Sequence, residues 1–340
     1  MRVLQAMAGA YHGGAEAFFM RLVPALQRAG VEQRAVIRRH PARAAALRAA
    51  GVEVVEMRFG GALDLSARPR LAAAIADFAP AVVMTWMNRA SRVCPRGDFV
   101  QVGRLGGYYK LKYYRRCRHL IANTEDIRRY LIDQGWPEER AHYLPNFADA
   151  RPTAPLDRAA LDTPAGAPLV VALGRLHRNK AFDVLIAALA TLPGVWLWLA
   201  GSGPLAADLA AQAARLGVAG RVRFLGWRDD APALIAAADA VVCPSRHEPL
   251  GNVVIEAWAH GAPVVAAAAQ GPAALIADGE TGLLAPVDDA PALAAAMARV
   301  LADRDLAARL AAAGRRAYDA RFSEAVVVGR YIDFLDRVAA

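Results

Sequence analysis

The sequence predicts an α/β protein of two domains, each built on a doubly wound parallel sheet, and three observations carry this prediction. The chain has 340 residues, which by length alone corresponds to about two domains. Hydrophobic residues make up 56% of it, enough for a sizeable core and too many for a disordered or fibrous chain. Short apolar runs alternate with longer alanine-rich stretches from end to end, and this alternation is typical of parallel sheets covered by helices on both faces.

The expected strands of the first half are short runs rich in Val, Ile and Leu, which favour buried extended backbone. They are Val3–Ala6, Ala35–Ile37, Val52–Val55, Ala81–Thr85, Phe99–Val102 and Leu120–Ala122. The segments between them are rich in Ala, Leu and Arg, which have high helix propensity. The expected helices are therefore near Ala15–Ala29, Ala42–Ala50, Ala67–Phe78 and Glu125–Gln134.

The second half repeats the pattern. Its expected strands are Leu169–Leu173, Val195–Leu199, Val222–Leu225, Ala240–Cys243, Pro263–Ala266 and Gly282–Leu284. The alanine-rich segments that follow these strands again predict helices. They are Ala181–Ala190, Leu205–Leu216, Pro232–Ala237, Val253–His260, Pro291–Ala302 and Leu306–Phe322.

A composition shift separates the two halves. The segment Asp149–Ala167 is rich in Pro, Ala and Asp and reads as a linker. We therefore expect one domain over residues 1–148 and a second over 149–322, facing a cleft in which ligands bind outside the carboxyl ends of the strands. A last helix around Glu324–Val338 lies beyond the second domain, and we expect residues 323–340 to cross back onto the first.

The net charge of +9 belongs to the first half of the chain. Residues 1–147 carry 23 Lys and Arg against 12 Asp and Glu, whereas residues 148–340 carry 18 against 20. Tyrosines and cations alternate most densely over residues 108–118, and this pattern suits contact with an anionic membrane surface. Its cations include Lys110, Lys112, Arg115 and Arg116. A solvated arginine-rich surface is the alternative, since only three of the 41 cations are lysines.

Cysteine usage and hydropathy bear on location. The three cysteines form no CxxC pair, which excludes a disulfide scaffold and makes a structural zinc site unexpected. No run approaches the roughly 18 apolar residues of a membrane-spanning helix. Met1 leads directly into an apolar strand, without the start of a signal peptide. We expect a cytoplasmic protein that associates peripherally with the inner face of the membrane.

Two cations follow the first strand of the second half. Gly174 and Arg175 come directly after it, and Lys180 stands at the start of the next helix. An arginine fork and a lysine point charge at a strand-to-helix turn suit phosphate oxygens. The spacing predicts an anion clamp, and a surface cation at a helix start is the alternative for Lys180.

A second loop combines carboxylates with a helix start. Glu248 precedes a helix, Gly251 permits close backbone approach, and Glu256 lies farther along the same helix. The first N–H groups of that helix, from Asn252 onward, point at whatever occupies the loop. The order of Glu248, the helix start and Glu256 along the chain suits the binding of a sugar, a diphosphate and a ribose, respectively. The alternative is a plain helix whose start Glu248 stabilises through the dipole.

These residues resemble a known family. The motifs Gly174-Arg175-Leu176 with Lys180, Gly201-Ser202-Gly203-Pro204 and the Glu-x7-Glu pair at 248 and 256 are similar to the nucleotide-sugar domain of retaining GT-B glycosyltransferases of group 1. Gly261-x-Pro263 and Gly279-x-x-Gly282 continue the series. In the first half, Gly13-Gly14-Ala15-Glu16, Asn123-Thr124-Glu125 and Leu144-Pro145-Asn146 resemble the acceptor-domain and hinge motifs. The resemblance covers nearly the whole chain and implies two Rossmann-like domains.

The resemblance assigns roles to individual residues. It implies that Arg175 and Lys180 hold the donor diphosphate and that Glu248 faces the transferred sugar. Glu256 would receive the ribose hydroxyls, and the turns at Gly174 and Gly13-Gly14 would approach the diphosphate. The backbone of the helix start would bind sugar or phosphate, and the segment after Gly226 would form the nucleobase wall. These last residues are Leu250, Gly251, Asn252, Val253, Trp227 and Arg228.

The sequence departs from the family at two places. A histidine often follows the fifth strand, but here Gly103 precedes Arg104, and His12 or Asn88 could supply the acceptor-side polar contact together with Arg104. The family's Gly-Gly-x-x-Glu turn lacks its glutamate at Ala274. That second departure removes one expected sugar or phosphate contact.

We therefore expect a metal-independent, retaining hexosyltransferase that needs no cofactor and uses a nucleotide diphosphate-sugar as donor. A UDP-sugar is favoured, with GDP- and ADP-sugars as alternatives. The basic first domain favours a glycan or lipid-linked acceptor, as in lipopolysaccharide or other cell-envelope glycan synthesis. A nucleotide-sugar epimerase of the same fold is the main alternative. A nucleic-acid-binding protein is disfavoured, because no recognition helix or stacking aromatic set accompanies the cations.

Overall fold

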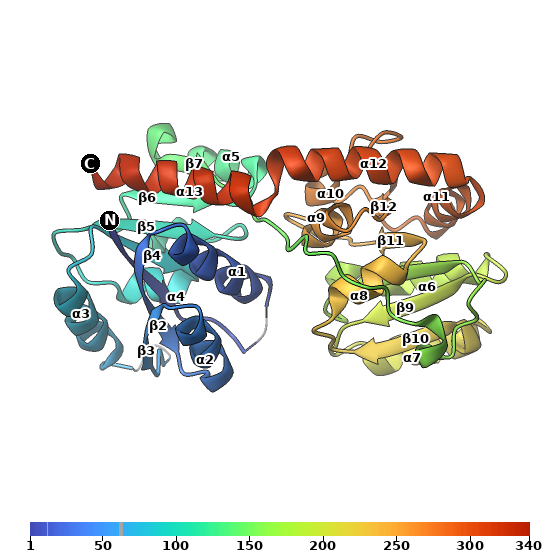
Figure 1. The fold of residues 1–340 in the computed structure, drawn as a ribbon, viewed down its shortest axis with the longest axis horizontal. Helices are drawn as coiled ribbons and strands as arrows, with labels where there is room; N and C mark the ends of the chain where they lie inside the picture. The colour runs from blue at the N-terminus through green and yellow to red at the C-terminus, as the bar shows by residue number, and fades with distance from the viewer. Residues whose placement is uncertain (12, 61–63) are drawn as a thin grey trace. The chain divides into compact units, whose positions relative to one another are not determined.

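Two parallel sheets organise the chain in the computed structural model, which describes residues 1–11, 13–60 and 64–340 (Figure 1). Unit 1 comprises Met1–Phe147 and Glu324–Ala340, and unit 2 comprises Ala148–Ser323. Each unit holds one sheet covered by helices, so the predicted α/β fold class is confirmed. No helix among the described residues is long and apolar enough to cross a membrane.

Unit 1 contains a seven-stranded sheet in the order β3-β2-β1-β4-β5-β6-β7. Every neighbouring pair in it is parallel. The central strands are buried on both faces, as the continuous apolar runs predict. The strands are β1 (Arg2–Met7), β2 (Glu32–Arg38), β3 (Glu53–Met57), β4 (Val82–Trp86), β5 (Val100–Leu105), β6 (His119–Ala122) and β7 (Ala141–Tyr143).

Separate hydrophobic clusters line this sheet. One joins α1 and α2 to the C-terminal helix α13, and another joins α3 and α4 to β1–β4. A third cluster packs α5 against β5–β7. The helices are α1 (Gly14–Arg28), α2 (Pro41–Ala49), α3 (Ala67–Phe78), α4 (Met87–Val93), α5 (Glu125–Asp133) and α13 (Glu324–Ala339).

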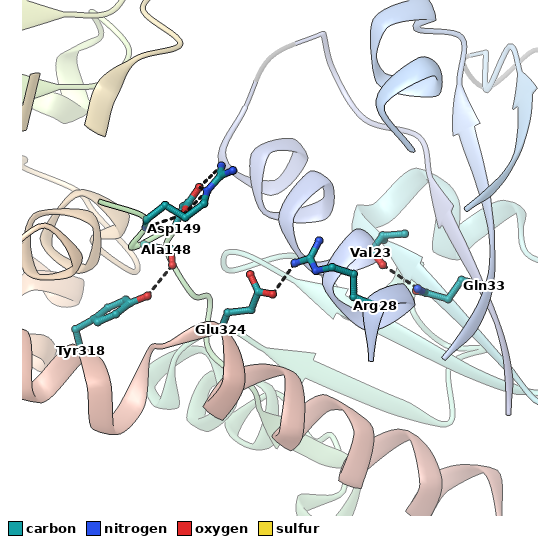
Figure 2. A network of polar contacts seen from close by, with 8 residues as sticks. Val23, Arg28, Gln33, Ala148, Asp149, Tyr318 and Glu324 are labelled. Atoms are coloured by element: carbon teal, nitrogen blue, oxygen red, sulfur yellow. Dashed lines mark hydrogen bonds and ion pairs between the residues drawn. The ribbon is translucent and has the colours of Figure 1, made fainter. Parts of the chain in front are cut away.

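The C-terminal helix completes unit 1, which confirms the predicted crossing. Val327, Tyr331 and Phe334 of α13 are buried in the cluster that contains Phe18 and Trp86. Figure 2 shows contacts close to the points where the chain leaves one unit and enters the other. Arg28 forms an ion pair of 2.5 Å with Glu324, and the Tyr318 hydroxyl donates to the Ala148 carbonyl at 2.8 Å. Each contact lies within a single unit.

Unit 2 contains a six-stranded parallel sheet in the order β10-β9-β8-β11-β12-β13. Its strands are β8 (Leu169–Leu173), β9 (Trp196–Ala200), β10 (Val222–Gly226), β11 (Ala240–Cys243), β12 (Val264–Ala267) and β13 (Leu283–Ala285). Its helices are α6 (Phe182–Ala190), α7 (Ala206–Arg215), α8 (Ala231–Ala237), α9 (Asn252–Ala259), α10 (Gln270–Leu275), α11 (Ala290–Ala302) and α12 (Arg304–Arg321).

Three short elements did not emerge from the sequence pattern: β7, α4 and α10. The expected linker also proves to be part of unit 2. Leu156 and Leu161 pack against the cluster around Trp198, and the Trp198 indole N–H donates to the Thr163 hydroxyl at 2.9 Å. Its Pro-rich composition produces irregular backbone, yet its apolar side chains are held against the sheet.

Candidate functional site

The carboxyl edge of the unit 2 sheet is closed by backbone contacts that only glycine permits. A Cβ at Gly201 would lie 1.8 Å from the Gly174 carbonyl oxygen, and one at Gly203 would lie 2.3 Å from the Leu176 carbonyl oxygen. The Gly174 N–H donates to the Ala200 carbonyl at 2.9 Å, and the Leu176 N–H donates to the Ser202 carbonyl at 3.0 Å. The Gly-Ser-Gly motif therefore fixes the loop that carries Arg175.

The two predicted phosphate-binding cations have different surroundings. Arg175 is exposed, and no hydrogen bond or ion pair joins its side chain to the rest of the described chain. Lys180 ends a short 3-10 turn just before α6, and its Nζ contacts a carboxylate oxygen of Glu248. Burial of the ammonium lowers the pKa of Lys180, but the charge of Glu248 and the more distant charge of Glu256 outweigh it, so the pKa is raised. Lys180 is therefore cationic at neutral pH.

Glu248 is held by several groups around its loop. The Gly251 N–H donates to Glu248 Oε1 at 3.3 Å, and the Ser245 hydroxyl donates to Oε2 at 3.4 Å. The Gly271 N–H donates to the Glu248 carbonyl at 2.7 Å, and a Cβ at Gly271 would lie 2.4 Å from the Leu250 backbone. The turn that lacks the family's glutamate thus still supports the Glu248 loop.

The start of α9 presents backbone rather than side chains. Gly251 caps the helix with a φ of +84°, a left-handed conformation that suits glycine. Leu250 and Val253 are buried, so what they can offer a ligand is their backbone N–H. Glu256 lies one turn into the helix and acts electrostatically on Lys180. The structure thus places Lys180 in contact with Glu248, and the charge of Glu256 acts on the same ammonium.

Trp227 and Arg228 follow β10 at the same edge. The Trp227 ring is half exposed, and its indole N–H donates to Asp229 at 2.9 Å. Arg228 forms a bidentate pair with Asp230, at 2.7 and 2.5 Å. The exposed ring offers a stacking surface at this edge of unit 2.

In unit 1, the glycine turn before α1 encloses a buried glutamate. Glu16 Oε1 accepts from the Ala10 N–H at 2.6 Å, and a Cβ at Gly13 would lie 2.4 Å from Glu16 Oε2. Arg43 donates to the Ala10 and Tyr11 carbonyls at 3.2 Å each. Glu16 and Arg43 thus hold the turn that contains Gly13 and Gly14. His12, one of the predicted acceptor-side residues, lies outside the described residues.

The structure revises the expectation for Arg104. Its side chain is 2% exposed at the carboxyl end of β5, too buried for direct contact with an acceptor. The guanidinium lies 4.6 Å from the ring centroids of both Phe18 and Trp86. It donates to the Tyr331 hydroxyl at 3.0 Å and contacts the carboxamide oxygen of Asn146. Arg104 therefore links the last helix and the hinge motif from inside the core.

Two asparagine oxygens in unit 1 are buried without a partner. Asn88 Oδ1 belongs to α4, which follows β4, and Asn123 Oδ1 belongs to the residue after β6. Both strands end at the same edge of the sheet, where Asn88 was predicted on the acceptor side. Asn123 belongs to a segment that resembles the family's acceptor-domain and hinge motifs, but its side chain was not among the predicted acceptor-side residues. A buried acceptor atom that lacks a hydrogen bond is costly, which is the property expected of an atom that a ligand will satisfy.

Comparisons with known proteins agree across the whole chain. The family profile described as "Glycosyl transferases group 1" matches residues 167–303, and the profile "Glycosyltransferase Family 4" matches residues 12–152. The lipopolysaccharide core biosynthesis glycosyltransferase LpsE of Rhizobium meliloti is 41% identical over 95% of this chain and 96% of its own. LpsD of the same organism is 38% identical, with 96% of each chain covered.

Solved structures reproduce the fold. The HepE protein of Anabaena, solved in complex with UDP-glucose, superimposes with a TM-score of 0.86 over 99% of this chain and all of its own, at 24% identity. A glycosyltransferase from Rickettsia africae gives a TM-score of 0.87 at 17% identity, with 99% and 98% covered. At this level of identity, the likeness concerns the fold.

Proposed function

Because this chain belongs to the group 1 glycosyltransferases, we propose that it transfers a hexose-type sugar from a UDP-sugar to a lipopolysaccharide core acceptor, with retention and without a metal. One observation carries the donor assignment: Lys180 and Glu248 meet at the carboxyl edge of the unit 2 sheet, beside the exposed Arg175. In open α/β sheets this edge is where ligands bind.

The proposed chemistry follows from charge. When the bond between the anomeric carbon and the diphosphate oxygen breaks, negative charge develops on the leaving diphosphate. Arg175 offers a free fork of donors, and Lys180 has three ammonium hydrogens, of which Glu248 needs one. The two cations would stabilise the leaving group, the role that a metal ion has in other transferases. Glu248 would accept hydrogen bonds from hydroxyls of the sugar, and Glu256 would accept hydrogen bonds from the ribose hydroxyls.

The acceptor assignment rests on the relatives and on unit 1. Both Rhizobium relatives are named for lipopolysaccharide core biosynthesis, and each matches this chain over nearly its full length. The unpartnered Oδ1 of Asn88 and of Asn123 can accept hydrogen bonds from sugar hydroxyls. A neutral, hydroxyl-recognising edge suits a glycan acceptor.

The experiment compares Arg175→Ala and Glu248→Ala with the native chain, using a UDP-sugar panel and an extracted core acceptor. We expect the native chain to release UDP only when the acceptor is present, and each variant to lose about 100-fold in turnover. Gly220→Ala is the control, because beyond the adjoining residues no atom lies within 4 Å of the new Cβ. Unchanged turnover in both variants would refute the site. Epimerised donor formed without acceptor would favour the epimerase.

We also propose that the basic segment of residues 108–118 contacts an anionic membrane surface. The four cations proposed for this contact are exposed, whereas Tyr114 is buried in the core and offers nothing to a membrane. They are Lys110, Lys112, Arg115 and Arg116. Replacing all four with Gln should abolish sedimentation with anionic liposomes, since each cation near such a surface contributes about 1 kcal/mol.

A matched control removes the same number of positive charges from exposed arginines of α11 and α12 instead. These are Arg299, Arg304, Arg309 and Arg316. Replacing them with Gln should leave sedimentation intact. Equal loss in both variants would mean that overall charge, and not this segment, drives binding.

A further inference from the structure

We infer that Arg246 is a positioning residue for the reaction: it clamps the loop of Glu248 to the loop of Lys180 and so sets the geometry of the pair. This inference rests on the proposed function for its kinetic part. Arg246 lies three residues after β11 and two residues before Glu248. None of the motif patterns in the sequence singles it out.

The side chain joins three segments of unit 2. Its Nη1 and Nη2 donate to the two carboxylate oxygens of Asp183 at 2.8 and 2.6 Å, a bidentate pair with the first turn of α6. Nη1 also donates to the Arg178 carbonyl at 3.0 Å, within the turn that ends at Lys180. Nε forms an ion pair with Asp288, which follows β13. The Arg246 side chain is 24% exposed.

The backbone reinforces the same link. The Arg246 N–H donates to the Asn179 carbonyl at 2.8 Å, and the His247 N–H donates to the same oxygen at 3.2 Å. Asn179 directly precedes Lys180. The loop of Glu248 and the turn of Lys180 are therefore joined by main-chain and side-chain bonds that converge within three residues of each functional group.

Charge gives the clamp a second consequence. Asp183 and Asp288 would place two carboxylates beside an anion-binding turn, where they would oppose a diphosphate. The Arg246 guanidinium forms ion pairs with both carboxylates and offsets part of their negative charge. Burial raises the pKa of Asp183, but the hydrogen bonds and charge of Arg246 outweigh it and lower the pKa, so the pair is charged at neutral pH.

These contacts predict a specific kinetic signature. Arg246 faces Asp183 and Asp288 rather than the donor, so its loss should misplace Lys180 and Glu248 without removing a donor contact. A displacement of about 1 Å at reacting groups can cost about 100-fold in rate. We expect Arg246→Ala to lower kcat by 10- to 100-fold. Because Asp183 and Asp288 then oppose the diphosphate, the Kd for UDP should rise as well, by a smaller factor. Arg246→Lys keeps the charge but not the fork, and should recover less than half of the lost rate.

Arg158→Ala is a matched control in the same unit. Arg158 has a 20% exposed side chain and also combines an ion pair, to Asp239 at 3.1 Å, with bonds to backbone carbonyls. Asp239 directly precedes β11, so this cluster lies at the amino end of the strands. Arg158→Ala should cost a similar shift in Tm and leave kcat within twofold.

Hydrogen exchange gives a readout that does not require turnover. In Arg246→Ala, the amides of residues 177–180 and 246–251 should exchange at least tenfold faster than in the native chain. In Arg158→Ala, the same amides should exchange at the native rate. Faster exchange without any turnover of UDP-sugars by the native chain would leave the clamp standing and refute the proposed function. Unchanged exchange, a kcat within twofold of native, or equal kcat losses in Arg246→Ala and Arg158→Ala would refute the clamp.

Discussion

The carboxyl edges of the two sheets are built differently. The edge of unit 2 is closed by backbone bonds between glycine-containing loops and by the contacts of Lys180 with Glu248 and of Arg246 with Asp183. The edge of unit 1 leaves the Oδ1 atoms of Asn88 and Asn123 without partners. In unit 2, Lys180 and Arg246 are paired before any ligand arrives and Arg175 is not, whereas the edge of unit 1 has unused hydrogen-bond acceptors.

This difference teaches how two ligands of different chemistry could be recognised by similar sheets. A diphosphate requires cations that are held in place, because reorganising charged groups during the reaction is costly. A glycan is neutral at most of its contacts and requires hydrogen-bond partners for hydroxyls. We therefore expect the basic residues of unit 1 to lie on its surface and in its core rather than among its contacts with a ligand.

The largest expected effect comes from disrupting the glycine contacts at the carboxyl edge of the unit 2 sheet. Gly201→Ala places a methyl group 1.8 Å from the Gly174 carbonyl oxygen at a residue whose φ is +151°. The clash and backbone strain should lower the free energy of unfolding by about 3 kcal/mol or more, measured by denaturant titration. Gly220→Ala, which meets no atom within 4 Å, should stay within about 0.5 kcal/mol of the native chain. Equal effects of the two substitutions would contradict the closed-edge description.

A smaller effect tests the buried cation of unit 1. Arg104→Met removes the hydrogen-bond donor of the Tyr331 hydroxyl, a group that stays buried. An unsatisfied buried group costs about 1–3 kcal/mol, so we expect a loss of about 1–3 kcal/mol in chemical denaturation. An unchanged stability with a raised KM for acceptor would instead place Arg104 in ligand contact.

The unpartnered asparagine oxygens at the carboxyl edge of the unit 1 sheet predict that one substitution will have opposite effects on stability and on acceptor binding. Asn123→Leu removes an unpartnered oxygen, so the free protein should keep or gain stability, by up to about 1 kcal/mol. The KM for acceptor should rise about fivefold, because a hydrogen bond to a sugar hydroxyl is worth about 1 kcal/mol. Thermal unfolding and initial rates at varied acceptor measure the two effects. An acceptor KM equal to that of the native chain would remove Asn123 from the acceptor edge.

The smallest expected effect concerns the protonation of a histidine pair in unit 1. His119 Nδ1 and His142 Nε2 lie 3.0 Å apart against Phe334. Burial, with the charges of His119, Arg337 and Arg128, lowers the pKa of His142 to about 4. The neutral ring is therefore favoured in the folded chain, and stability that is present above about pH 6.5 is lost as the pH falls towards 4.

His142→Gln keeps a hydrogen-bonding group but cannot titrate. We expect a smaller drop in Tm between pH 7 and pH 5 than in the native chain. Hydrogen exchange should show the difference in unit 1 only. Burial also lowers the pKa of His260 in unit 2, but that histidine is the same in variant and native chain. The same pH profile in variant and native chain would rule out the histidine pair as its source.

The fold was predictable because its signal is local. Most of the predicted strands are rich in apolar residues, whereas β7 is Ala-His-Tyr and α10 contains Gly271 and Pro272. The helix that crosses to unit 1 was predicted from its position after the last expected element. Its Tyr331 contact with Arg104 spans 227 positions and leaves no local pattern.

The site was predictable where one loop carries its own motif. Lys180 and Glu248 were expected at one site, and the structure shows them in contact. Arg246 and Asp183 are 63 positions apart, and neither alters the composition of its segment. Arg104 was assigned by its place at a strand end, which does not reveal whether a side chain turns outward or into the core. Pairing across loops is a property of the folded chain.

The return of α13 to unit 1 also affects how the protein is made. The residues of unit 2 all precede Glu324, so the whole of unit 2 is synthesised before α13. Unit 1 starts at the N-terminus but lacks Tyr331, Phe334 and Leu335 of its core until that helix emerges. The half of the protein that is synthesised first is thus the half that finishes folding last, and its exposed apolar face is the one that a chaperone would meet during translation.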